Sequence, residues 1–110
     1  MENHRGPLLV PMLVIAEVSY LLERKAGVPI ELRFLKDLST GTYEAMPVEQ
    51  VDWIRIAELT STYRDLPLGA VDASVVALAE RLKVTQIATL DRRHFSVVRP
   101  RHVDGFELLP

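Results

Sequence analysis

The 110-residue sequence contains no cysteine, which excludes disulfide bonds and thiolate metal sites. The absence suits a reducing compartment, and we expect a cytoplasmic protein. Aromatic residues make up only 6% of the chain, so few side chains could stack on sugar rings. The formal net charge is −2, so no overall positive field indicates a nucleic-acid-binding protein.

The sequence also lacks a hydrophobic run long enough for a membrane span. The most apolar stretch, between Leu8 and Leu22, is interrupted by Pro11 and Glu17 and falls short of the roughly 20 residues that a span needs. No small-x-small cleavage site of a secretory signal follows it. We therefore expect a buried core segment here and no contact with a membrane.

What is present is the composition of an ordinary globular protein, with 48% hydrophobic and 25% charged residues. No repeat or linker divides the chain, so residues 1–110 are predicted to form a single domain. Near the C-terminus lies a basic run without any acid: Arg92, Arg93, His94, Arg99, Arg101 and His102. The run either meets phosphates or is simply a solvated basic chain end.

Helical and extended segments alternate along the chain. The predicted helices cover residues 11–26, 30–38, 49–64 and 70–83. The predicted strands cover residues 8–10, 42–48, 84–90, 96–99 and 106–109. This alternation predicts an α/β fold with a parallel sheet and helices on both faces, in which ligands bind beyond the carboxyl ends of the strands.

Two of the predicted helices have a face that we expect to be buried. For residues 49–64 this face carries Val51, Ile54 and Ala57, with Trp53 and Ile56 beside it. For residues 70–83 the buried stripe is Val71, Val75, Leu78, Ala79 and Leu82. Ser74 and Arg81 are expected on the opposite side of that helix.

Three carboxylates stand beside apolar sequence. Helical spacing puts Glu17 next to apolar residues, so we expect it to point toward packed structure, although an edge position or an arginine partner is equally compatible. Asp72 flanks a buried stripe in a first helical turn, where the helix dipole alone could account for it. Asp91 follows a strand directly, where it could cap a turn or belong to a site.

The three acids make more chemical sense together than apart. Converging carboxylates repel one another unless a cation lies between them, and Mg²⁺ or Mn²⁺ prefers such oxygen ligands. A metal held in this way can orient a water and stabilise charge on a phosphodiester. Zinc is disfavoured, because His4, His94 and His102 have no paired ligand spacing.

Three segments resemble the conserved blocks of PIN domains, in the order and context of that family. PMLVIAEVSYLL, residues 11–22, resembles the helix with one glutamate, which would be Glu17. LPLGAVDASVVALAERL, residues 66–82, resembles the helix opened by an aspartate, which would be Asp72. TLDRRHF, residues 89–95, resembles the block that carries Asp91 and a neighbouring hydroxyl, Thr89. Together they look like a VapC-type toxin ribonuclease.

The resemblance implies a three-layer α/β/α fold with a mainly parallel sheet, and Mg²⁺- or Mn²⁺-dependent cleavage of RNA. Glu17, Asp72 and Asp91 would hold the metal and act as the catalytic acids. A less specific expectation is that Ser74, Thr89 and Arg93 support these ligands or contact phosphate. VapC-type members usually form homodimers and are inhibited by a cognate antitoxin protein.

The sequence departs from the family pattern at its beginning. The family domain starts with a strand that ends in an aspartate, followed by a helix, and the present sequence begins at the equivalent of the second strand. Either the first strand is encoded upstream of the assigned start, or the chain is a remnant whose exposed sheet edge a partner covers. The remnant would be a non-catalytic binding or dimerisation module. A sugar hydrolase that uses two of the carboxylates is a third alternative.

Overall fold

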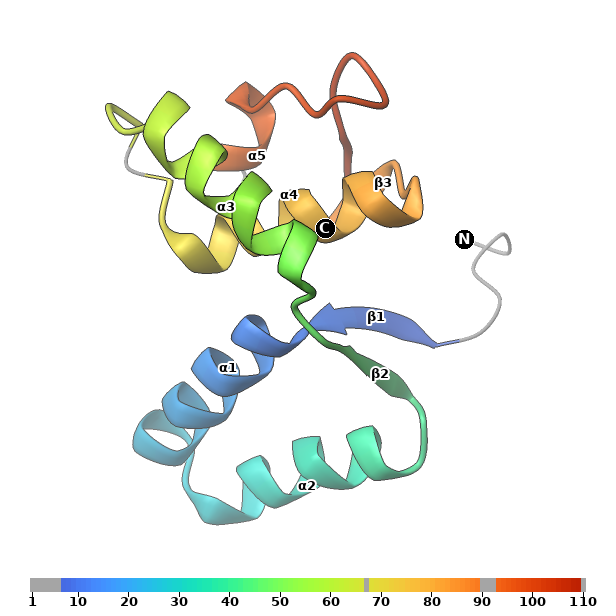
Figure 1. Ribbon diagram of the computed structural model, residues 1–110. Coiled ribbons are helices and arrows are strands. Elements are labelled where there is room, and N and C mark those ends of the chain that lie inside the picture. The colour runs from blue at the N-terminus through green and yellow to red at the C-terminus, as the bar shows by residue number, and fades with distance from the viewer. Residues whose placement is uncertain (1–6, 67, 90–92, 110) are drawn as a thin grey trace. The chain divides into compact units, whose positions relative to one another are not determined.

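The computed structural model of the chain describes residues 7–66, 68–89 and 93–109 (Figure 1). They belong to two compact units, Met1–Pro47 and Val48–Pro110, which we call unit 1 and unit 2. The elements of unit 1 are β1 (Leu8–Pro11), α1 (Met12–Lys25), α2 (Val28–Ser39) and β2 (Tyr43–Met46). Those of unit 2 are α3 (Gln50–Thr62), α4 (Ala70–Leu82), β3 (Gln86–Ala88), α5 (Arg93–Val97) and β4 (Glu107–Leu109). None of the helices among the described residues is long and apolar enough to cross a membrane.

Unit 1 is a pair of parallel strands joined through two helices (Figure 1). Parallel strands need a long crossover, which α1 and α2 supply between β1 and β2. The bend between the helices depends on Gly27, whose φ of 91° suits glycine and whose N–H donates to the Leu22 carbonyl at 2.9 Å. The predicted helices and strands of this unit are confirmed, with ends that differ by a few residues.

The apolar run near the N-terminus is not the buried core segment that we predicted. Pro11 is buried, but no residue of α1 is, and Tyr20 on its surface is 58% exposed. A helix with apolar residues all round buries them only if it is covered on every side. Within unit 1, α1 packs against α2, β1 and β2, and these elements do not cover the rest of its surface.

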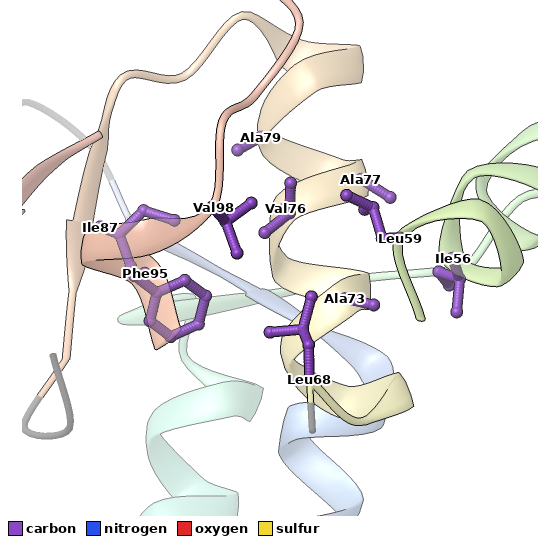
Figure 2. Close-up of a cluster of buried hydrophobic side chains, with 10 residues drawn as sticks. All are labelled: Ile56, Leu59, Leu68, Ala73, Val76, Ala77, Ala79, Ile87, Phe95 and Val98. Carbon is purple, nitrogen blue, oxygen red and sulfur yellow. The ribbon is translucent and has the colours of Figure 1, made fainter. Parts of the chain in front are cut away.

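Unit 2 is built around α4, which carries much of its hydrophobic core (Figure 2). Ala73 and Val76 of this helix are fully buried. Figure 2 shows Ile87, Phe95 and Val98 gathered along one side of α4. Helix α3 packs against α4 and adds Ile56 and Leu59 to the same cluster. Strands β3 and β4 pair in parallel, Gln86–Ala88 against Glu107–Leu109, so every pairing among the described strands is parallel.

The predicted strand over residues 96–99 is wrong, because residues 93–97 form the short helix α5. Phe95 and Val98 stand three positions apart, which puts both on one side of a helical turn. Both are buried, at 6% and 0% exposure. The run of β-favouring residues Phe95, Val97 and Val98 suggested a strand, but packing against the core decides in favour of a turn of helix.

The buried faces of α3 and α4 also differ from the predicted ones. Helix α3 buries Asp52, Ile56 and Leu59, whereas Val51 and Ile54 of the predicted face are exposed. Helix α4 buries more than a stripe, and its buried residues are Ala73, Ser74, Val76, Ala77, Leu78 and Ala79. The reason is that α4 is covered on two sides, by α3 and by the group of Ile87, Phe95 and Val98. Ser74, expected on the open side, is therefore inside.

Candidate functional site

Asp72 is the third residue of α4 and lies in its first turn. Gly69 occupies the N-cap position and has no side chain to offer, and Asp72 is the acidic residue in the first turn, at the positive end of this helix. The side chain is 35% exposed, and it is therefore accessible to a ligand although it borders the core. This placement agrees with both predicted roles, the helix-end charge and the site acid.

His94 of α5 is the partner of Asp72. The Nδ1 atom of His94 lies 2.7 Å from Oδ2 of Asp72. Because an ionised carboxylate only accepts, Nδ1 carries the proton and donates it. The buried side chain of Phe95, next to His94 in sequence, fixes α5 on the core and so holds the imidazole over the first turn of α4. We missed this pair in the sequence, where His94 is one member of a basic run.

The other two predicted acids are not joined to Asp72 by the described structure. Glu17 lies exposed on α1, in unit 1, which agrees with the edge position and not with the packed one of the two alternatives. Asp91 falls outside the described residues. Within the described ranges no three His, Cys, Asp or Glu side chains form a group that could hold a metal ion. The three-acid site is thus an expectation from sequence.

The three supporting residues have distinct environments. Ser74 is 3% exposed, and its hydroxyl donates to the carbonyl of Val71 at 2.6 Å. Thr89 follows β3, and its N–H donates to the carbonyl of Leu109 at 3.2 Å, which prolongs the β3–β4 pairing. Arg93 begins α5 and is exposed. Thr89 and Arg93 are the described residues on either side of the segment that contains Asp91.

A second group of acids in unit 2 is bound to arginines. Asp52 is 5% exposed and accepts from Nε and Nη2 of Arg81, each at 3.0 Å. Glu80 accepts from Nε and Nη2 of Arg55 at 2.7 and 2.9 Å. We call these two pairs the arginine–carboxylate network. They line a hollow of about 280 Å³ to which Asp72 does not contribute.

The network has a clear electrostatic effect on Glu80. Burial pushes its pKa upward, but hydrogen bonds from Arg55 and from the backbone N–H of Arg101 outweigh burial and hold the pKa below its ordinary value. The same bond and the charge of Glu80 raise the pKa of Arg55, against the opposing effect of burial. Both groups therefore stay charged at neutral pH, and the pairs serve the packing of α3 on α4.

Part of the basic run is tied into unit 2. Arg101 donates from Nη2 to Glu58 at 2.7 Å, and His102 donates from Nε2 to the carbonyl of Val84 at 2.6 Å. The N–H of Arg99 donates to the hydroxyl of Tyr63 at 2.9 Å. The side chains of Arg101 and His102 are therefore anchored to unit 2, whereas Arg93 and Arg99 are exposed, so the two alternatives for the run stay open.

Comparisons with known proteins agree with the resemblance seen in the sequence. The PIN domain family matches residues 1–99, a range that contains all the predicted acids. The chain is 37% identical over 109 residues to Ribonuclease VapC26 of Mycobacterium tuberculosis (strain ATCC 25618 / H37Rv), and the match covers 99% of this chain and 81% of that protein. The family match confirms the predicted α/β/α fold class, and the parallel pairing of both described sheets is consistent with it. The chain belongs to the PIN domain family.

Proposed function

We propose that this chain is a metal-dependent endoribonuclease, the toxin component of a type II toxin–antitoxin pair. The observation that carries the proposal is its 37% identity, across 99% of its length, to a protein named as a ribonuclease. On this proposal its substrate is RNA and its partner is a cognate antitoxin protein. A homodimer acting in the cytoplasm is the assembly that we expect.

Glu17, Asp72 and Asp91 are the residues that would hold the ion. Residues 1–110 would then act as a single domain, because Glu17 belongs to unit 1 and the two aspartates belong to unit 2. When bound, Mg²⁺ or Mn²⁺ supplies an activated water and compensates charge on the phosphodiester.

The acids present fit such an ion. Among the described residues neither Glu17 nor Asp72 has a lysine or arginine partner, whereas Asp52 and Glu80 each have one. Glu17 and the partly exposed Asp72 are also accessible, and their hard oxygen atoms suit Mg²⁺ or Mn²⁺. Carboxylates that meet around a cation need no arginine to remain ionised.

The roles of the supporting residues follow from where they lie. Ser74 is buried and bonded within its own helix, so we assign it to the support of Asp72 and not to contact with RNA. Arg93 is exposed beside the Asp91 segment, where its guanidinium could pair with a phosphate of the substrate. Thr89 would fix the end of β3, from which Asp91 follows.

The test is cleavage of a labelled single-stranded RNA by the full chain with added Mn²⁺. We expect Glu17→Gln, Asp72→Asn and Asp91→Asn each to reduce cleavage to background. The matched controls are Glu23→Gln, on the same helix as Glu17, and Asp65→Asn, an exposed aspartate of unit 2. Both controls should cleave like the wild type.

Two outcomes would contradict the proposal. If Asp72→Asn and Asp91→Asn cleave as fast as the wild type, the site is wrongly assigned. If the wild type binds no Mn²⁺ or Mg²⁺ in calorimetry and cleaves no RNA while a purified antitoxin still binds, the chain is a binding module without catalysis.

A further inference from the structure

We infer that His94 is a positioning residue that fixes the Asp72 carboxylate for the metal ion, an inference that rests on the function proposed above. The Nδ1–H of His94 donates to Oδ2 of Asp72 at 2.7 Å. Among the described residues, no other side chain donates a hydrogen bond to the Asp72 carboxylate. The bond from His94 engages Oδ2, so Oδ1 would be the oxygen available to a cation.

The physical reason is the rotational freedom of an aspartate on a helix surface. A carboxylate that is 35% exposed turns about its side-chain bonds, and Mg²⁺ accepts only narrow octahedral geometry. A donor on one oxygen stops that rotation before the ion arrives, and groups that orient metal ligands in this way are worth about 10- to 100-fold in affinity. His94 is a suitable donor, because Phe95 beside it is buried and α5 cannot easily move.

In the alternative, the roles of the two residues are exchanged. Asp72 would orient His94, and Nε2 of His94 would act on the RNA as a base. The two readings make different demands on residue 94. Positioning of Asp72 needs only an N–H near the place of Nδ1, which an asparagine amide also offers. Base catalysis needs an imidazole. A glutamine extends its amide toward the place of Nε2 and serves neither purpose.

The experiment measures Mn²⁺ affinity by titration calorimetry and RNA cleavage for His94→Phe, His94→Asn and His94→Gln in the full chain. We expect His94→Phe and His94→Gln to weaken Mn²⁺ binding by about 10- to 100-fold, and His94→Asn to recover most of the affinity and the cleavage. Ser96→Ala, on the exposed side of the same short helix, is the control and should bind Mn²⁺ like the wild type. Unfolding by denaturant without metal shows whether each variant is folded.

Asp72→Asn, measured in parallel, separates the two levels of the proposal. If it binds Mn²⁺ as tightly as the wild type, the proposed metal site itself fails. If it loses Mn²⁺ while His94→Phe binds normally, only the role of His94 is overturned. The role is also overturned if all three His94 variants bind Mn²⁺ like the wild type but cleave no RNA, since the imidazole would then act on the RNA itself.

Discussion

The two ends of α4 carry acids of opposite character. At its C-terminal end Glu80 has a side chain that is 10% exposed and is clamped by two bonds from Arg55. At its N-terminal end Asp72 is 35% exposed, and its described partner is a histidine. The difference teaches that acids on one helix can have different surroundings, one closed by an arginine and one open to a ligand. Glu80 is neutralised by Arg55 and holds α3 on α4, whereas Asp72 is the acid that we propose binds a metal ion.

The largest expected effect comes from breaking the network at Arg81. Arg81→Ala leaves Asp52 buried without its cation, which should lower the free energy of unfolding by roughly 3–5 kcal/mol. Denaturant unfolding measures the loss. Under conditions in which the variant remains folded, its Mn²⁺ affinity should equal that of the wild type.

Arg64→Ala serves as the control for Arg81, because Arg64 is exposed just beyond α3. Its free energy of unfolding should stay within about 0.5 kcal/mol of the wild type. Equal stability of the two variants would show that the Asp52–Arg81 pair contributes little.

Two substitutions, one at each end of α4, test whether stability and metal binding depend on different acids. Glu80→Gln weakens the charged bonds from Arg55 and should cost about 1.5–3 kcal/mol of stability, while Mn²⁺ binding is unchanged. Asp72→Asn should cost less than about 1 kcal/mol, the usual size of a helix-end charge effect, while Mn²⁺ binding is lost. If both variants lose stability equally and both bind Mn²⁺, the two ends do not differ in function.

The pH dependence of stability should report Glu80. Because its pKa in the folded protein lies below the ordinary value of 4.5, its pairing stabilises the protein fully above that pH. The contribution disappears as the pH falls below 4.5 and through the lower folded pKa. We therefore expect the stability difference between wild type and Glu80→Gln to shrink in denaturant unfolding between pH 7 and about pH 3. A constant difference would contradict this.

The smallest effect is expected at the C-cap of α4. Lys83 has a φ of 59°, a left-handed conformation that costs a non-glycine residue about 1 kcal/mol. Lys83→Gly should therefore raise the free energy of unfolding by about 0.5–1 kcal/mol. Lys36→Gly, in the last turn of α2, is the matched control and should lower it by about 1 kcal/mol. A loss at both positions would argue against the strained cap.

The long helices were predictable because local signals define them. Gly27 lies between α1 and α2, Pro29 stands in the first turn of α2, and Gly69 precedes α4. These signals act within a few residues of the chain. The buried face of α3 was not predictable, because Val51 with Ile54 and Ile56 with Leu59 are equally apolar pairs at helical spacing. The true face contains Asp52. A search for apolar residues at helical spacing excludes this charged residue, and only the structure shows that Arg81 neutralises it.

The candidate site also contains residues that the sequence predicted and one that it did not. Glu17, Asp72 and Asp91 were found from motif order, and the family match supports the domain to which those motifs belong. Their meeting in space remains a prediction. His94 was missed as a site residue because its partner lies 22 positions away and no periodic pattern joins them. The signal available in advance was Phe95 beside it, an apolar residue within the basic run.

The sequence by itself determined the α/β fold class, the extents of the four long helices and the acids worth testing, because helix signals and short motifs are local. Only the tertiary structure decided which of these side chains bind one another. Arg81 reaches Asp52 across 29 positions, and His94 reaches Asp72 across 22. Pairings of that kind depend on how α3, α4 and α5 pack, and packing is chosen by the burial of the whole core and not by any one segment.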